Sequence, residues 1–590
     1  MTLINIGWDF LKRKKAAFGA IVALQVLQVL LSLVLPAINA KIIDDGIIPE
    51  NVPLIWRLGG IMLGIAILQI LAMVGAIYLG AKTAMELGRE LRAKTFRQVQ
   101  SFSATDQHKF GAPTLITRTT NDVTQVQMVI LLTFTVMIMA PIMGFGGVFM
   151  AIQQNAKLSL LLIVVVPLLG ALILLVMRAL SPRYRIQQER IDRINTLLRE
   201  QLTGVRVIRA FVRQDTEREK FDTANKNLRE IWLQIGFLWA FMMPAANLVI
   251  GVASAAVVWF AGHLIEAGDM QVGALTAYIT YLMMIMMAVM MSGMMVMLFP
   301  RGEVSAKRLQ EIYDVDPSIK APASPTPLPA GPISFELDNA CLKYPGAEEP
   351  VLNDINMTFA PGKVTALIGS TGSGKSSVIR LLPRVIDATG GEVRAGGIPV
   401  TDLDPKELRS RIALVPQRAF LFSGTIASNV AGSPSADVAL DPERVTRALQ
   451  AAQAWEFVEK LEKGIDAEVE SGGKNFSGGQ RQRLTIARAI YRCLPDENGE
   501  RQADLLIFDD SFSALDFITD ARLRSGLRSF VGDIAVFIVA QRVSTIRQAD
   551  EIHVLDAGAV VGRGRHEELL ETCETYQEIV ASQLSAEEAR

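Results

Sequence analysis

Cysteine and histidine are scarce in this sequence, which has three cysteines and four histidines among 590 residues. Cys341, Cys493 and Cys573 all lie in the C-terminal half at unrelated spacings, so no disulfide framework is predicted. The histidines are too scattered to form the closely spaced ligand set of a zinc site. The formal net charge is -1, with no basic domain or acidic tail, so we expect no nucleic-acid partner.

Charge is also scarce in long runs of the first 300 residues. A membrane-spanning helix needs about 20 predominantly apolar residues. Six such runs occur, at about 17–40, 58–80, 128–151, 158–178, 234–262 and 273–298. The first follows a basic cluster, Lys12–Lys15, but it is longer than the apolar core of a signal peptide and lacks a cleavage pattern, which favours a membrane helix. Six runs without internal charges disfavour buried helices of a large soluble protein.

Lysine and arginine indicate which side each connection faces. They are frequent at the N-terminus and in the segments 81–127 and 178–232, and rare in the other, short connections. Because positively charged loops stay on the cytoplasmic side, the N-terminus, both long segments and the C-terminal half are predicted to be cytoplasmic. Both long segments are amphipathic, so we expect helical extensions with turns near 108–114 and 211–217 that contact the soluble half.

Proline gathers in residues 315–332, where six prolines predict an extended spacer. This spacer separates a predicted membrane domain, residues 1–314, from a soluble domain, residues 333–590. Strands are predicted at 333–337, 364–368 and 505–509 in the soluble domain, because each is a short apolar run.

A P-loop pattern follows the strand at 364–368 directly and leads into a predicted helix at 377–382. Its glycines let backbone N–H groups approach phosphates, Lys375 supplies a cation and the Ser376 hydroxyl can ligate Mg²⁺. Asp509, which ends the strand at 505–509, provides the acidic partner for that Mg²⁺. The sequence therefore predicts ATP and Mg²⁺ as ligands, with nucleotide contacts from Gly369, Thr371, Gly372, Ser373, Gly374, Lys375, Ser376 and Ser377.

Between these motifs, Ser477-Gly478-Gly479-Gln480 matches the core of a signature motif, and with it nearly the whole chain resembles the ABC transporter family. The resemblance implies an exporter-type membrane α-helical domain with six spans, followed by an α/β P-loop NTPase domain with a RecA-like core and a helical subdomain. It also implies roles for further residues: Tyr344 stacks on adenine, Gln417 joins Ser376 and Asp509 at Mg²⁺, Asp516 belongs to the D-loop 513–516, and residues 477–480 face ATP held by a second chain.

Two positions depart from the family pattern. Asp510 stands where the catalytic residue is normally glutamate, and it is shorter by one carbon–carbon bond, roughly 1.5 Å. Gln541 stands where a switch histidine is usual, and glutamine cannot become cationic near neutral pH. The pair predicts a site that binds ATP but hydrolyses it slowly. It is similar to the degenerate-site subunit of bacterial heterodimeric multidrug ABC exporters, including the Thermotoga type.

The predicted function is ATP-driven export through the inner membrane of a bacterium, as an ATP hydrolase-coupled translocase that works with a second half-transporter. The spans hold almost no ionisable residues, which favours amphipathic or apolar substrates such as drugs, lipids or peptides. The methionine-rich sixth span is either an adaptable substrate wall or packing filler. Three alternatives remain: an importer with the same fold, such as a siderophore importer, a homodimeric exporter, and an ATP-gated regulatory or channel-like protein.

Overall fold

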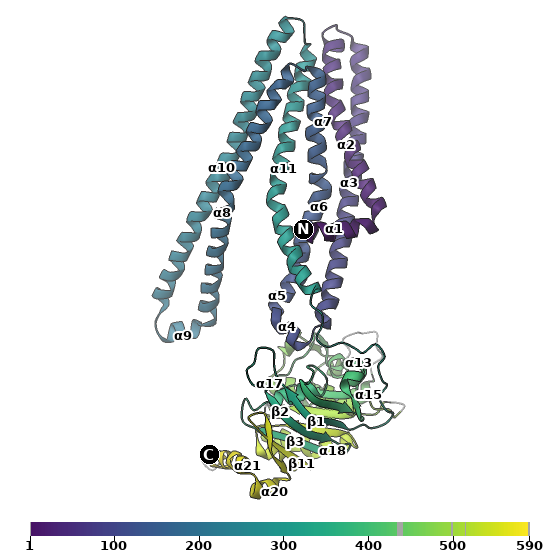
Figure 1. Cartoon of the computed structure of the whole chain (residues 1–590), viewed down its shortest axis with the longest axis vertical. Coiled ribbons are helices and arrows are strands. Elements are labelled where there is room, and N and C mark those ends of the chain that lie inside the picture. Colours follow the sequence, from purple (N-terminus) through teal and green to yellow (C-terminus); the bar gives the residue numbers. More distant parts are fainter. Residues whose placement is uncertain (1, 433–440, 497–498, 514, 588–590) are drawn as a thin grey trace. The chain divides into compact units, whose positions relative to one another are not determined.

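The computed structural model describes residues 2–432, 441–496, 499–513 and 515–587. Its contacts divide the chain into two compact units (Figure 1). The first contains residues 1–101 and 110–316, and the second contains residues 102–109 and 317–590. The first is helical, and the second combines three sheets with short helices.

Six helical stretches of the first unit are long and apolar enough to cross a membrane, so the predicted six-span architecture is confirmed for the described residues. They are Lys15–Ile47, Val52–Ser101, Ala112–Gln154, Leu158–Thr203, Gln214–Glu266 and Val272–Tyr313. The long helices within them are α2 (Lys15–Lys41), α3 (Val52–Ser101), α7 (Met139–Gln154), α8 (Leu162–Thr203), α10 (Gln214–Glu266) and α11 (Val272–Tyr313). Each predicted apolar run lies inside its stretch, because polar turns continue the helix beyond the apolar part.

Small residues and buried tyrosines hold α2, α7 and α11 together. A Cβ atom on Gly147 of α7 would lie 2.8 Å from Ile285 of α11, so glycine is what allows this close approach. The Tyr281 hydroxyl donates a 2.7 Å hydrogen bond to the Leu33 carbonyl oxygen of α2. That bond satisfies a polar group inside an apolar helix bundle, where an unpaired hydroxyl would be costly.

The first helix, α1 (Thr2–Arg13), is amphipathic and packs on the bundle through Leu3 and Phe10. Its opposite side exposes Trp8, and its last turn ends in two basic residues, a pattern typical of helices that lie in the membrane interface. The carboxylate of Glu303 on α11 accepts hydrogen bonds from the backbone N–H groups of Thr2 and Leu3, at 2.9 and 3.0 Å. Glu303, which lies on the spanning helix α11, therefore caps α1.

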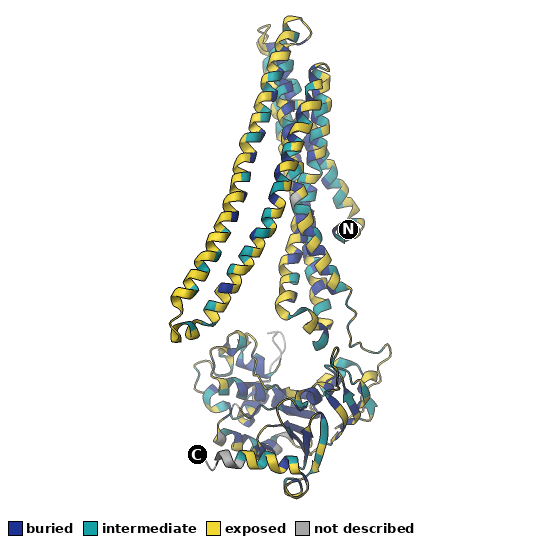
Figure 2. Ribbon diagram, turned by 60° about the vertical axis from the view of Figure 1, so that its left-hand side comes forward, coloured by how far each residue is buried: buried dark blue, intermediate teal, exposed yellow. Residues whose placement is uncertain are grey.

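Helices α8 and α10 form a hairpin through α9 (Val205–Ala210) and diverge from the other spans toward α9 (Figure 1). They pack against each other through a separate apolar cluster that includes Val176, Leu180, Ile231 and Ile235. Much of the remaining hairpin surface is exposed (Figure 2). Exposed side chains on α10 include Trp232 and Phe237, with 51% and 72% of their surface accessible.

The second unit is built on a six-stranded sheet in the order β12-β11-β3-β10-β9-β6. Five strands are parallel neighbours, and only β12 pairs antiparallel. A four-stranded antiparallel sheet, in the order β2-β1-β4-β5, lies in the same unit. The six strands of the larger sheet are β3 (Val364–Gly369), β6 (Ile412–Val415), β9 (Leu505–Asp509), β10 (Ala535–Val539), β11 (Glu551–Asp556) and β12 (Ala559–Gly564).

The smaller sheet contains β1 (Phe335–Leu342), β2 (Leu352–Phe359), β4 (Gly390–Ala395) and β5 (Ile398–Pro399). The α-helices that follow the spacer are α12 (Lys375–Leu381), α13 (Pro405–Ser410), α14 (Ile426–Val430), α15 (Pro442–Ala451), α16 (Trp455–Val458), α17 (Gly478–Cys493), α18 (Phe517–Val531), α19 (Val543–Ile546), α20 (His566–Thr572) and α21 (Glu574–Glu587). Helices α14, α15 and α17 pack into one apolar cluster with the sheet. The combination is the predicted P-loop domain with a helical subdomain.

Residues 102–109 group with the second unit although they lie between two spans of the first. They contain most of the short helix α4 (Ala104–Phe110). Asp106 accepts 3.0 Å hydrogen bonds from both the backbone N–H and the hydroxyl of Ser318, at the start of the proline-rich spacer. The segment between the second and third spans is therefore attached to the spacer.

Candidate nucleotide-binding site

Four neighbouring strands of the large sheet end at the predicted site. The strands β3, β10, β9 and β6 are parallel and adjacent, so their carboxyl ends meet at one edge. The P-loop follows β3, Asp509 ends β9, Gln541 follows β10 and Gln417 follows β6. The carboxyl edge of an open parallel sheet is where ligands bind in such folds.

The P-loop adopts a backbone that only glycine accommodates well. Gly372 and Gly374 have φ angles of +90° and +108°. A Cβ atom on Gly369 would lie 2.1 Å from the Leu555 carbonyl oxygen. The hydroxyl of Ser373 is buried and has no hydrogen-bond partner among the described residues. An unpaired buried hydroxyl in a glycine-rich turn fits a phosphate ligand, which would supply the missing acceptor.

Lys375 begins α12 and reaches back over the loop. Its ammonium group donates 2.7 Å hydrogen bonds to the carbonyl oxygens of Gly369 and Ser370. Burial lowers the pKa of Lys375, and the nearby carboxylates of Asp510 and Asp509 partly oppose that effect. Ser376, next in the helix, is exposed, whereas Ser377 is buried. The structure thus places a cation and an exposed hydroxyl side by side at the end of the loop.

Asp509 and Asp510 form an acidic pair opposite Lys375. Burial raises the pKa of Asp509, and the charge of Asp510 raises it further. Burial also raises the pKa of Asp510, although a hydrogen bond from Gln417 and the charge of Lys375 act against it. Carboxylate, hydroxyl and amide oxygens, which Asp509, Ser376 and Gln417 carry, are the ligands that a hard divalent cation prefers. Ser376, Gln417 and Asp509 are the residues that would hold Mg²⁺ here.

Tyr344 lies beside the P-loop helix. Its hydroxyl is 3.1 Å from the Ser377 hydroxyl, and Arg380 donates a 3.4 Å hydrogen bond to the same tyrosine oxygen. These contacts tether the ring next to the phosphate loop, as its predicted stacking on adenine requires. Sequence reasoning did not single out Arg380, whose charge also lowers the pKa of Asp509.

Gln541 is exposed at the end of β10. The charge of Arg542 lowers the pKa of Asp510, and the backbone N–H of Gln541 lowers it further. The Gln541 carbonyl oxygen accepts a 2.8 Å hydrogen bond from the side chain of Gln583. Arg542 and Gln583 were not predicted; Arg542 is the sequence neighbour of Gln541, but no local signal marks Gln583.

The signature residues lie at the N-terminus of α17. Ser477 caps this helix: its hydroxyl accepts from the Gln480 backbone N–H at 3.3 Å, and its own N–H donates to the Gln480 side chain at 2.9 Å. Ser477 and Gly478 are exposed. Within the described ranges, no hydrogen bond or ion pair joins residues 477–480 to the P-loop. The helix N-terminus therefore presents an anion-binding end that the chain's own P-loop does not use.

Asp516 is separate from the acidic pair. Its carboxylate accepts hydrogen bonds from the backbone N–H and the hydroxyl of Thr519, at 2.9 and 2.7 Å, and these lower its pKa. The Ser513 hydroxyl donates a 2.7 Å hydrogen bond to the Asp510 carbonyl oxygen. Ala514, in the predicted D-loop, lies outside the described residues.

Comparison with known proteins finds a family match in each half of the chain. Residues 18–289 match the family model for the ABC transporter transmembrane region, and residues 352–512 match the family model described as ABC transporter. An uncharacterised ABC transporter ATP-binding protein of Mycobacterium tuberculosis is 43% identical over 562 residues, which cover 95% of this chain and 94% of that protein.

Two relatives have named activities. A multidrug efflux ATP-binding/permease protein of M. tuberculosis is 30% identical over 566 residues, covering 96% of this chain but 46% of that protein. An ATP-dependent lipid A-core flippase of Chromobacterium violaceum is 29% identical over 551 residues, covering 93% of this chain and 91% of that protein.

Proposed function

Because this chain belongs to the ABC transporter family, as a multi-pass membrane protein with an ATP-hydrolysing domain, we propose that it is one half of a heterodimeric exporter. In this proposal it holds the weaker of two ATP sites and lends an intact signature to the stronger one. The observation that carries the proposal is the combination of Asp510 and Gln541 at an otherwise complete site.

The shape of the site supports weak hydrolysis. Asp510 is shorter than glutamate by roughly 1.5 Å, and a misplacement near 1 Å can cost about 100-fold in rate. Its carboxylate is drawn toward Gln417, which donates to it across 3.3 Å. Gln541 offers an amide that cannot gain a positive charge. Nucleotide binding depends on the P-loop, Asp509 and Tyr344, which all keep their expected residue types and lie together.

Two surfaces support a second subunit. The exposed N-terminus of α17 can receive the terminal phosphate of ATP held by another chain. The exposed apolar side chains of the α8–α10 hairpin, including Trp232 and Phe237, would be covered by another membrane domain. The efflux relative, of which this chain matches 46%, is long enough to contain two such halves.

The substrate proposal is an amphipathic or apolar compound, such as a drug, a lipid or a peptide. One relative is named for multidrug efflux and another for flipping of lipid A-core. Methionines of α11 surround the helix: Met286 is fully buried, whereas 50% of Met283 and 62% of Met287 is exposed. Only part of this methionine set can therefore face one cavity, and that part would provide an adaptable wall.

The proposed cycle couples ATP to transport through differential binding. ATP favours the closed pair of nucleotide domains because it contacts both a P-loop and a second chain's signature there. Mg²⁺, held by Ser376, Gln417 and Asp509, would neutralise phosphate charge. Closure opens the membrane cavity outward, and hydrolysis at the stronger site resets it. The bilayer would be a bacterial inner membrane, with the N-terminus and nucleotide domain in the cytoplasm.

The test is steady-state ATPase activity in nanodiscs, for this chain alone and for its complex with a co-expressed second half-transporter. We expect little activity alone and strong activity in the complex, abolished when the partner's catalytic glutamate is replaced. Robust activity of this chain alone, lost on Asp510→Ala, would favour a homodimeric exporter instead. Transport assays in inside-out and right-side-out vesicles distinguish export from import, and substrate accumulation against a gradient distinguishes a pump from a gated channel.

A further inference from the structure

The side chain of Gln583 on the C-terminal helix α21 forms hydrogen bonds with the switch segment, defined here as residues 540–546. The Gln583 amide donates a 2.8 Å hydrogen bond to the carbonyl oxygen of Gln541. Its oxygen accepts a 2.8 Å hydrogen bond from the backbone N–H of Val543. One planar amide thus binds both sides of a two-residue turn, which requires a donor and an acceptor on the same group.

Helix α21 is firmly anchored in the nucleotide domain, so Gln583 can hold the switch segment in one position. Tyr576 is fully buried, and its hydroxyl lies 2.7 Å from the Nδ1 atom of His566 on α20. Ile579 and Val580, one turn later, pack against the main apolar core of the nucleotide domain. Gln583 is the next turn of the same helix, and it projects from that anchored base onto the switch segment.

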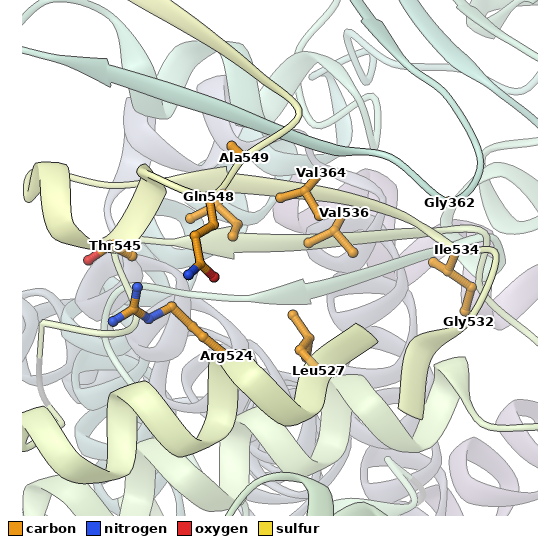
Figure 3. Close-up of a pocket in the computed structure, with 11 residues that line it drawn as sticks. Gly362, Val364, Arg524, Leu527, Gly532, Ile534, Val536, Thr545, Gln548 and Ala549 are labelled. Atoms are coloured by element: carbon orange, nitrogen blue, oxygen red, sulfur yellow. The ribbon is translucent and has the colours of Figure 1, made fainter. Parts of the chain in front are cut away.

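Arg524 of α18 also holds the switch segment. Its guanidinium donates a 2.7 Å hydrogen bond to the Ser544 carbonyl oxygen and pairs with Asp520 through two 2.9 Å bonds. In Figure 3, Arg524 extends from its helix toward the segment that carries Thr545, along a small cavity of about 70 Å³. Arg524 therefore holds the later part of the segment, whereas Gln583 forms its hydrogen bond with Gln541 itself.

Gln541 connects this helix to the acidic pair. Its carbonyl oxygen is bound by Gln583, and the carbonyl oxygen of Val539, two residues earlier, accepts a 2.8 Å hydrogen bond from the backbone N–H of Asp510. A shift of the turn would move the Gln541 side chain and loosen Asp510 together. We propose that Gln583 is a positioning residue, which holds the switch turn so that this chain's site distinguishes ATP from ADP. The inference goes beyond the heterodimer proposal and does not depend on it.

The experiment uses the full-length chain in nanodiscs, in the oligomer in which it purifies. Photolabelling with azido-ATP is read on the band of this chain, with competition by a non-hydrolysable ATP analogue or by ADP. Gln583→Ala should raise the analogue concentration needed for half-displacement about fivefold, the effect of roughly one lost hydrogen bond, and leave the ADP value unchanged. Because binding is measured, the outcome is independent of hydrolysis at this site.

A matched control separates positioning from general damage to α21. Gln577 is a glutamine on the same helix whose amide donates a 2.7 Å hydrogen bond to the Leu570 carbonyl oxygen, away from the switch segment. Gln577→Ala should leave both displacement values unchanged. Gln583→Glu keeps the acceptor for Val543 but loses the donor to Gln541, so it should match Gln583→Ala in competition and retain the native unfolding temperature. Equal losses for ADP and the analogue, equal effects of both alanine variants, or no change in Gln583→Ala and Gln583→Glu would overturn the inference.

Discussion

The side-chain amide of Gln417 donates a 3.3 Å hydrogen bond to the carboxylate of Asp510, and this bond joins the ends of β6 and β9. The residue at the catalytic position is therefore held by a neighbour that would also ligate Mg²⁺. A longer side chain at position 510 would extend past this contact into the site. This contact is a physical reason why ATP hydrolysis is proposed to be slower at this site than at a competent one.

Restoring the two family residues should restore hydrolysis at this chain's site. We expect Asp510→Glu with Gln541→His to raise single-turnover ATP hydrolysis there by up to about 100-fold, because the carboxylate regains its reach and position 541 gains a titratable ring. The measurement uses a complex whose partner lacks its catalytic glutamate, so that only this site is observed. Asp510→Ala in the otherwise unmodified complex is the control, and it should lower ATPase activity less than twofold. A loss of most activity in that control would contradict the prediction.

Two glycines provide a paired test of structure and recognition. Gly369→Ala would place a methyl group 2.1 Å from a backbone oxygen that cannot move freely, so the nucleotide domain should lose about 3 kcal/mol of stability. The unfolding temperature should fall by about 6–12 °C. Gly478→Ala meets no atom within 4 Å, so its unfolding temperature should stay unchanged while ATPase activity of the complex falls. Equal thermal effects of the two variants would disprove the packing argument.

Sequence patterns located the strands of the site well because each is a buried apolar run. Residues 364–368 and 505–509 were predicted as strands, and β3 and β9 span Val364–Gly369 and Leu505–Asp509. Two signals were needed for the long helices: the apolar run 58–80 marks only the membrane part of α3, which spans Val52–Ser101, and the amphipathic pattern after residue 80 predicted its helical extension. Hydropathy alone reports where a helix meets lipid, so it does not give the helix ends.

The supporting contacts of the site could not be predicted from sequence. Gln583 is 42 positions away from Gln541 and touches it only because α21 folds back onto the domain. Arg380 lies in a helix whose pattern suggests an ordinary exposed arginine, yet it reaches Tyr344. Both contacts depend on how separate elements pack, and a motif of adjacent residues does not encode that packing.

The loop tip around Asp106 should respond to acid. Burial would raise the pKa of Asp106, but hydrogen bonds from Ser318 and Ser103 outweigh it and lower the pKa from 3.8 to about 2. A lowered pKa means that the carboxylate stabilises the folded state above about pH 4 and loses that effect as the pH falls toward 2. Asp106→Asn should therefore lower the unfolding temperature near neutral pH, with the difference from wild type shrinking between about pH 4 and 2.

Differential scanning calorimetry across that pH range is the measurement. Lys109, which lies 3.5 Å from Asp106 and is exposed, offers a control, since Lys109→Ala removes a solvent-screened cation and leaves the hydrogen bonds of Asp106 with Ser103 and Ser318 in place. A difference between Asp106→Asn and wild type that stays constant down to pH 2 would show that the charge of Asp106 is not responsible.

The cap that Glu303 provides to α1 can be tested by hydrogen exchange. Glu303 accepts from the first two free N–H groups of α1, where a carboxylate also complements the helix dipole. Loss of a cap costs about 1 kcal/mol, so Glu303→Ala should speed amide exchange across residues 2–13 about fivefold. Gln310→Ala, on the same helix, removes a side chain whose hydrogen bond among the described residues goes to Asp314, and it should leave α1 exchange unchanged. Unchanged exchange in Glu303→Ala would mean that the packing of Leu3 and Phe10 holds α1 without its cap.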